Sequence, residues 1–210
     1  MVHHFNIALL SLFIPTFLFV SATPGMCMTL SLTLGMTIGV RRTMWMMLGE
    51  LVGVALVSIA AVIGVAAVML NYPFIYIGLK FGGGAYLTFL GIQLWRSLGK
   101  MALQQVGGEV VEVSRFTLIL QGFVTAIANP KGWAFMISLL PPFIDSDLPL
   151  KPQLSLLVLI ILVIEFACLL LYAGGGKTLR RFLKQSGNVR MMNRVAGTLM
   201  IGVGFWLMAG

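Results

Sequence analysis

The sequence predicts an all-α integral membrane protein in which six transmembrane helices form two inverted three-helix repeats. Three observations support this prediction: the composition, the spacing of the apolar segments, and a proline break at a corresponding place in each half. Of the 210 residues, 59% are hydrophobic and only 10% are charged, and the mean hydropathy is +1.01. Soluble domains carry about a quarter charged residues. The composition therefore excludes a water-soluble globule, and we expect a lipid bilayer around the protein.

Six apolar segments have lengths that suit a membrane crossing, for which about 20 apolar residues are needed. The first stretch, Phe5–Val40, is too long for one straight crossing, and Pro24 divides it. A secretory signal begins with Lys or Arg residues, and none precedes this stretch. We therefore expect it to be a membrane span that is not cleaved off. The other predicted spans are Thr43–Leu70, Phe74–Trp95, Phe116–Leu140, Leu154–Gly174 and Val195–Ala209, the last beginning nearer Met191.

The positions of the charged residues predict how the spans are oriented. Three alternate loops hold eleven of the 14 Lys and Arg residues: Arg41, Arg42, Arg96, Lys100, Arg115, Lys177, Arg180, Arg181, Lys184, Arg190 and Arg194. The other loops hold only Lys151, with Asp145 and Asp147. The positive-inside rule then makes the basic loops cytoplasmic, including the connecting loop 96–115, and both termini periplasmic. The net charge of +8 thus reflects topology. Without aromatic residues interleaved among the bases, it predicts no nucleic-acid partner.

The two halves of the chain, about 5–95 and 116–209, carry matching features. Phe19-Val20-Ser21-Ala22 precedes the first break and Phe123-Val124-Thr125-Ala126 precedes the second, and the second span of each half contains one acid, Glu50 or Glu165. Because each half has three spans, an odd number, the halves enter the membrane from opposite sides. Inverted repeats around a site at the bilayer midplane are a recurring plan of transporters. We therefore expect residues 1–210 to form a single transmembrane transporter domain.

The two breaks, Thr23-Pro24-Gly25 and Asn129-Pro130-Lys131, predict a binding site between the halves. A backbone group freed inside a membrane helix is tolerated only where it is buried in protein or lines a cavity. Lys131 follows the second break, where the dipole of a half-helix favours an anion. We expect Lys131 to bind the carboxylate of a substrate. The alternative is that it only pairs with Glu50 or Glu165 and holds the halves together.

Two acids and one tryptophan are further candidates for this site. A charge near the bilayer centre is costly, so by default it faces a cavity or a partner. Glu50 lies within Gly49-x-x-x-Gly53, a pattern that lets a neighbouring helix approach closely. We expect it to bind a substrate ammonium group or to carry a proton that couples transport, with a structural ion pair as the alternative. For Glu165, the sequence favours neither a role in proton coupling nor a purely structural role over the other. Trp133 either lines the cavity or packs in the core.

Two glycine runs and two cysteines have less specific interpretations. Gly82-Gly83-Gly84 and Gly174-Gly175-Gly176 either allow close helix packing or mark a helix end. Cys27 and Cys168 lie in apolar segments, and we expect small buried hydrophobic residues without a disulfide.

Two other classes of function compete with transport of a small molecule. An ion exporter would use Cys27, Glu50, Glu165 and Cys168 as metal ligands, but two thiols without an intramembrane His make a poor site for a soft metal. A membrane enzyme or assembly factor would leave the paired breaks unexplained. Both histidines are at the N-terminus, and the chain lacks a His-Glu-x-x-His zinc motif. We therefore expect neither an enzyme nor a cofactor.

Several motifs together resemble the lysine-exporter superfamily, in the branch that exports homoserine, threonine and neutral amino acids. They are Pro24-Gly25 in the first span, Gly49-Glu50 in the second, Gly84-Ala85-Tyr86-Leu87 with Leu90-Gly91 in the third, and Asn129-Pro130-Lys131 in the fourth. The resemblance extends from Phe5 to Ala209. Asn-Pro-Lys in a fourth span is its most specific part.

This resemblance implies a bacterial inner-membrane exporter of amino acids or their derivatives, driven by the proton motive force. It also implies that six residues line the route: Pro24, Gly25, Glu50, Asn129, Pro130 and Lys131. Two departures concern the lining, because the family often has Pro and Asn where this chain has Met26 and Cys27, and Asp where it has Glu50. The sequence therefore leaves open which amino acid is carried. It also leaves open whether the protein forms a homo-oligomer.

Overall fold

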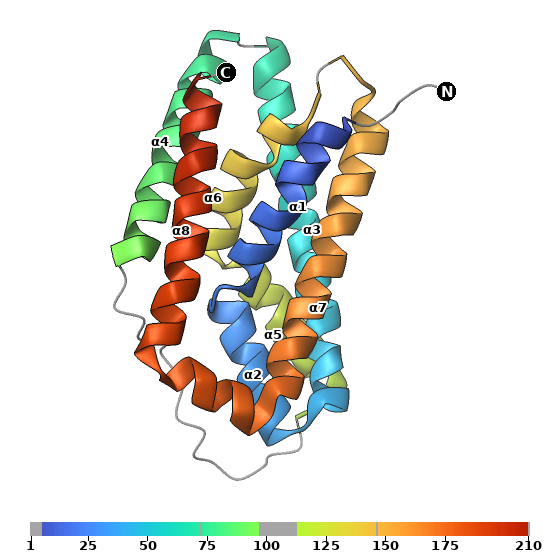
Figure 1. Ribbon diagram of the computed structural model, residues 1–210. Coiled ribbons are helices and arrows are strands. Elements are labelled where there is room, and N and C mark those ends of the chain that lie inside the picture. Colours follow the sequence, from blue (N-terminus) through green and yellow to red (C-terminus); the bar gives the residue numbers. More distant parts are fainter. Residues whose placement is uncertain (1–5, 72, 97–112, 146, 210) are drawn as a thin grey trace.

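The computed structural model describes residues 6–71, 73–96, 113–145 and 147–209, and within these ranges every regular element is a helix (Figure 1). In chain order, the elements are α1 (Ile7–Ala22), α2 (Met26–Thr37), α3 (Val40–Asn71), α4 (Pro73–Arg96), α5 (Arg115–Ile127), α6 (Pro130–Leu139), the 3-10 turn η1 (Pro141–Phe143), α7 (Leu150–Lys184) and α8 (Ser186–Ala209). The all-α prediction is confirmed for these residues. The connecting loop predicted over 96–115 lies mostly outside them.

The length and apolar character of the helices fit a membrane protein. The segments Val40–Gly64 of α3 and Leu150–Gly176 of α7 are each long and apolar enough to cross a bilayer. The helices α1 and α2 meet the same criterion as a pair, and they are bent by 55° at the residues between them. The first predicted span is therefore a broken one, as expected from Pro24.

Both predicted breaks are present, and their backbone follows from the prolines. A proline pushes the residue before it out of the helical region, because its ring collides with that residue's backbone. Thr23, before Pro24, is extended with φ −68° and ψ 129°. Asn129, before Pro130, is extended with φ −78° and ψ 102°. Each proline thus ends one half-helix, and a second half-helix begins at Met26 or at Pro130.

Two helices are longer than the predicted spans. α7 continues past Gly174 to Lys184, with a bend at Gly176, whose φ of 43° and ψ of −132° suit a residue without a side chain. α8 begins at Ser186 rather than near Met191. Polar and basic residues can continue a helix beyond the bilayer, so the end of an apolar run does not mark the end of the helix. In α8, the Arg194 guanidinium lies 4.7 Å from the ring centre of Trp95 on α4.

The helices of the two halves pack against each other. α3 runs along α5 and α6, while α7 runs along α2 and α1, so the broken pair of each half contacts the second long helix of the other half (Figure 1). α4 and α8 form the third close pair. α1 begins and α8 ends at one end of the molecule, and α5 begins at the opposite end (Figure 1). Both breaks lie between these ends.

Glycines bring these pairs into backbone contact. On α3, a Cβ atom at Gly53 would lie 2.7 Å from Cβ of Ala126, and one at Gly49 would overlap the carbonyl oxygen of Ile119. The close approach predicted from the Gly49-x-x-x-Gly53 pattern is therefore confirmed. On α4, a Cβ at Gly84 would lie 2.8 Å from the carbonyl oxygen of Gly204 on α8, whereas Gly82 faces open space.

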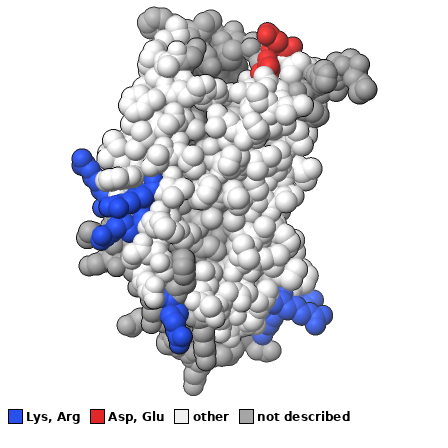
Figure 2. Space-filling model, in the orientation of Figure 1, with Lys and Arg blue, Asp and Glu red and all other residues white. Residues whose placement is uncertain are grey.

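The charged side chains are divided along the length of the molecule. On the face shown in Figure 2, the acidic atoms lie at the end where α1 begins, and the Lys and Arg atoms lie further toward the opposite end. Asp145 joins the acidic end to the start of α1, because its Oδ2 accepts a hydrogen bond from Asn6 Nδ2 at 3.2 Å. At the other end, Arg42 donates to the carbonyl oxygen of Val113 at 3.1 Å. The predicted orientation of the spans, with both termini periplasmic, stays a prediction.

Candidate functional site

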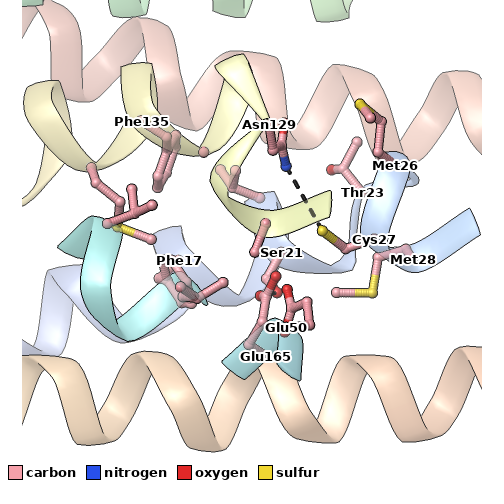
Figure 3. Close-up of a pocket in the computed structure, with 17 residues that line it drawn as sticks. Phe17, Ser21, Thr23, Met26, Cys27, Met28, Glu50, Asn129, Phe135 and Glu165 are labelled. Atoms are coloured by element: carbon pink, nitrogen blue, oxygen red, sulfur yellow. Dashed lines mark hydrogen bonds between the residues drawn. The ribbon is translucent and has the colours of Figure 1, made fainter. Parts of the chain in front are cut away.

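A cavity lies between the two breaks, where α1, α2, α3, α5, α6 and α7 meet (Figure 3). We call it the central cavity. Five of the predicted site residues line it: Thr23, Gly25, Glu50, Asn129 and Glu165. Its volume is ≈ 70 Å³, well below the roughly 300–1,000 Å³ of pockets that enclose a small-molecule ligand. A cavity of this volume has room for no more than a few water molecules.

Glu50 is the most deeply buried acid of the cavity. Its side chain is 0% exposed, and neither carboxylate oxygen has a hydrogen bond of ordinary geometry within the described part of the chain. Cys27 and Glu165 are close enough to interact with it, and Figure 3 shows them beside it. A buried carboxyl group without compensation costs several kcal/mol, so nearly all such groups in proteins have a partner. The arrangement is therefore typical of a site where the partner is a ligand or a proton.

Glu165 reaches the same cavity from α7. Ser21, in the last turn of α1, donates a hydrogen bond from its hydroxyl to Glu165 Oε2. The structure thus brings together the two acids that the sequence placed in the second spans of separate halves. Two carboxyl groups in one small cavity repel each other when both are charged. A proton or a cation between them removes that repulsion.

The half-helices α2 and α6 begin at the breaks, beside the central cavity. Gly25 caps α2 and Asn129 caps α6, and neither N-terminus has a hydrogen bond from a capping side chain. The first N–H groups of a helix lack partners inside the helix and carry the positive end of its dipole. The Asn129 amide makes only a long contact, 3.9 Å, to the Cys27 sulfur. The N-termini of helices favour negatively charged groups in this way.

Two other predicted site residues, Pro24 and Trp133, are not among the described residues that line the cavity. Pro24 lies in the break itself, between two lining residues. Trp133 packs against the core cluster that contains Phe17 and Phe135, and its indole N–H donates to the carbonyl oxygen of Ile127 at 2.8 Å. The backbone of Pro130 opens α6. The side chains of Pro130 and Lys131 lie outside the described part of the structure.

Sequence reasoning missed much of the lining. Ser21 and the apolar residues Phe17, Met28, Phe135 and Met136 also face the cavity, as does Cys27, which the resemblance had already placed in the lining. In so apolar a chain, Phe and Met carry no signal that separates a cavity from lipid. Ser21 could have been found from its position within two residues of the first break.

The alternative of a metal exporter receives no support from the geometry. Cys27 and Cys168 are both buried free thiols, and both belong to one hydrophobic core cluster with Leu169 and Tyr172. In the portions of the chain that the structure covers, no three His, Cys, Asp or Glu side chains come together in a way that could hold a metal ion.

Comparison with known proteins places this chain among transport proteins. A family model described as LysE type translocator matches residues 18–210. An uncharacterized membrane protein of Vibrio cholerae is 26% identical over 89% of this chain and 90% of its own length. A homoserine/homoserine lactone efflux protein of Salmonella typhimurium is 25% identical over 88% of each chain. A leucine efflux protein of an Enterobacter species is 26% identical over 88% of this chain and 87% of its own.

No solved structure matches the chain significantly. The family match covers both breaks, both acids of the central cavity and all the helices from α2 onward. The apolar helices and the relatives described as membrane and efflux proteins agree with it. The chain therefore belongs to the LysE type translocator family and is a multi-pass membrane protein.

Proposed function

We propose that this protein is a secondary transporter that exports amino acids or small amino-acid derivatives across the bacterial inner membrane in exchange for protons. One observation carries the proposal: the buried Glu50 carboxyl group, without an ordinary hydrogen-bond partner among the described residues, lies in the same cavity as two uncapped half-helix N-termini. An acid and an anion seat at close range complement a zwitterion.

The two ends of an amino acid would find opposite partners in the central cavity. Its ammonium group would contact Glu50, whose buried carboxylate would gain the compensation that it lacks. Its carboxylate would accept hydrogen bonds from the N–H groups at the start of α2 and α6. Lys131, in the first turn of α6, would add a full positive charge there. The shape of this seat would be set by the residues of the two breaks, Thr23, Pro24, Gly25, Asn129 and Pro130. Trp133 would stabilise the second break through its hydrogen bond to Ile127.

Proton coupling would use Glu50 and Glu165. Both line the cavity, so a proton or an ammonium group can balance the charge of either acid. When cargo leaves, a proton that enters from the other side would restore that balance. Each transport cycle would then exchange cargo for at least one proton.

Alternating access would come from the two halves moving against each other. The crossed packing of α3 on α5 and of α7 on α1 and α2 supports six spans in two inverted repeats. The separation of acidic and basic ends supports periplasmic termini. The small volume of the cavity supports a closed intermediate between the inward-open and outward-open conformations.

The relatives support export over uptake, because those whose descriptions name a function are efflux proteins for homoserine, homoserine lactone and leucine. The apolar part of the lining, with Phe17, Val57 and Phe135, can accommodate an apolar side chain. It does not by itself select one amino acid.

The decisive experiment is transport by the purified protein in proteoliposomes. Vesicles are loaded with labelled homoserine, threonine, leucine, methionine or lysine, and efflux is followed with and without a pH gradient. We expect rapid efflux of at least one neutral amino acid, accelerated by a gradient that is acidic outside the vesicle. Protein-free vesicles provide the leak rate. Efflux of no amino acid above this rate, with a correctly folded protein, would refute the proposed function.

A further inference from the structure

Each break leaves a carbonyl oxygen that a continuous helix would have satisfied. Ala22 is the last residue of α1 and Ile127 is the last residue of α5. In an unbroken helix, their carbonyls would accept from the N–H groups four residues later, at positions 26 and 131. These positions instead begin the next half-helices, so both carbonyls need another donor in an environment where an unsatisfied one is costly.

In both halves, an aromatic side chain supplies this donor. The hydroxyl of Tyr172 donates to the carbonyl oxygen of Ala22 at 2.8 Å. The indole N–H of Trp133 donates to the carbonyl oxygen of Ile127 at 2.8 Å. Neither bond was evident from the sequence, yet each accepting residue is the last residue of the half-helix that leads into its break. The same structural problem is thus solved at both breaks by the same chemical device.

The two donors differ in where they come from. Trp133 belongs to α6, within the same broken span as Ile127, so its hydrogen bond can persist when that span moves as a unit. Tyr172 belongs to α7, in the other half of the protein. Its hydrogen bond must break whenever α1 and α7 separate.

Tyr172 lies at a junction between two hollows. Its side chain and Ala22 both line a second, mostly apolar hollow of ≈ 470 Å³, which continues past Gly175 to Leu179 and Met192. The neighbours of Ala22 in the chain, Ser21 and Thr23, line the central cavity instead. A second hydrogen bond between the same two helices, from Ser21 to Glu165, lies on the side of the central cavity.

We propose that Tyr172 and Trp133 are positioning residues of the transport cycle, with different tasks. Trp133 keeps the second break in shape in every conformation. Tyr172 fastens the end of α1 to α7 in the closed conformation and releases it when the central cavity opens toward the second hollow. This inference rests on the proposed transport function for its kinetic consequences, but the fastening itself can be tested without cargo.

The cysteines of the chain make that test direct. Cys27 lines the central cavity, so its reactivity reports the opening of the cavity, and a Cys168→Ser background leaves it as the sole thiol. A membrane-impermeant maleimide is applied to right-side-out and to inside-out vesicles, and the ratio of the two labelling rates is measured. We expect Tyr172→Phe to change this ratio by roughly 2- to 10-fold, the effect of losing one net hydrogen bond from one conformation.

Matched variants separate fastening from general damage. Tyr86→Phe removes the hydroxyl of an exposed tyrosine on α4 and should leave the ratio unchanged. Ser21→Ala removes the second bond between α1 and α7 and should shift the ratio in the same direction as Tyr172→Phe. If Tyr172→Phe fails to insert into the membrane, the Ser21→Ala variant still tests the inference. Replacement of Tyr172 by 4-aminophenylalanine keeps a donor in place and should restore the original ratio.

Kinetics of efflux distinguish the two positioning roles. Trp133→Phe should raise KM about tenfold with a smaller effect on the maximal rate, because the site is distorted in every conformation. Tyr172→Phe should alter mainly the maximal rate, and Trp206→Phe is the control for loss of an indole. Unchanged labelling and kinetics in both Tyr172→Phe and Ser21→Ala would overturn the inference. A wild-type protein that exports nothing, but whose labelling ratio still responds to Tyr172→Phe, would refute only the transport proposal.

Discussion

Gly122 on α5 lies directly against the backbone of Glu50 on α3. A Cβ atom at Gly122 would stand 2.9 Å from the amide nitrogen of Glu50, and it would overlap the carbonyl oxygen of Met46 one turn earlier. The helix that leads into the second break is therefore in backbone contact with the helix that carries the buried acid. The position of Glu50 in the central cavity depends on this contact.

Replacing Gly122 by alanine should consequently separate α3 from α5. The obstructing atoms belong to the backbone and cannot turn aside, so we expect a loss of about 1–3 kcal/mol or more in stability, together with a strong loss of efflux. The melting temperature of the detergent-purified protein measures the first effect. Gly64→Ala, on the same helix α3 but with nothing within 4 Å, is the matched control and should be neutral or slightly stabilising. An equal effect of both substitutions would contradict the importance of this contact.

Substitution of Glu50 by glutamine should abolish efflux without unfolding the protein. Glutamine has nearly the same shape but cannot hold an exchangeable proton or balance an ammonium group. Because the carboxyl group is buried without an ordinary partner among the described residues, its removal should leave the melting temperature equal or higher. The measurement is efflux alongside thermal melting, with Asp147→Asn in the loop before α7 as the control. Full activity of Glu50→Gln would remove Glu50 from both of its proposed roles.

Lys131→Ala should weaken the binding of the cargo carboxylate. Loss of a hydrogen bond to a charged group is typically worth about 1.5–3 kcal/mol, so KM should rise roughly 10- to 100-fold by the usual relation between energy and affinity. The amide of the same amino acid lacks the carboxylate. Its apparent affinity, measured by competition for transport, should therefore decrease much less in Lys131→Ala. If the amino acid and its amide are affected equally, Lys131 acts on the structure rather than on the carboxylate.

A thiol reagent at Cys27 should block efflux, and cargo should protect against it. Cys27 faces the central cavity, where an attached maleimide would fill the space that cargo needs. In the Cys168→Ser background, saturating cargo should slow both labelling and inactivation. Cys27→Ser should transport normally and resist the reagent, which also tests the metal-exporter alternative. Inactivation of Cys27→Ser at the same rate would show that the reagent acts elsewhere.

The sequence located the breaks because proline has a backbone consequence that does not depend on the surroundings. Pro24 and Pro130 both interrupt their helices, and the residue before each is extended, as the geometry of proline requires. The Gly49-x-x-x-Gly53 pattern was equally reliable, since a missing side chain matters only where another backbone approaches. Burial of Glu50 followed from the cost of a charge in lipid. These predictions needed only local chemistry.

The remaining features depend on contacts between distant parts of the chain. Nothing near Tyr172 indicates that its hydroxyl reaches Ala22, and Trp133 could be placed either in the cavity or in the core until its partner Ile127 was known. The apolar span of α7 ends at Gly176, close to the predicted Gly174, and the chain continues beyond the bend as a helical basic segment that hydropathy does not report. Hydropathy reports where lipid ends. It does not report where a helix ends.

The hydrogen bond from Tyr172 to Ala22 joins residues that are 150 positions apart in the chain. While the protein is being made, the first span therefore leaves the ribosome long before its donor exists. Until α7 docks, the carbonyl at the first break must accept a hydrogen bond from water or a lipid headgroup. The N-terminal span should therefore stay near the membrane surface and remain mobile in the translocon. A nascent chain arrested before Tyr172 should be far more open to proteolysis near Ala22 than the full-length protein.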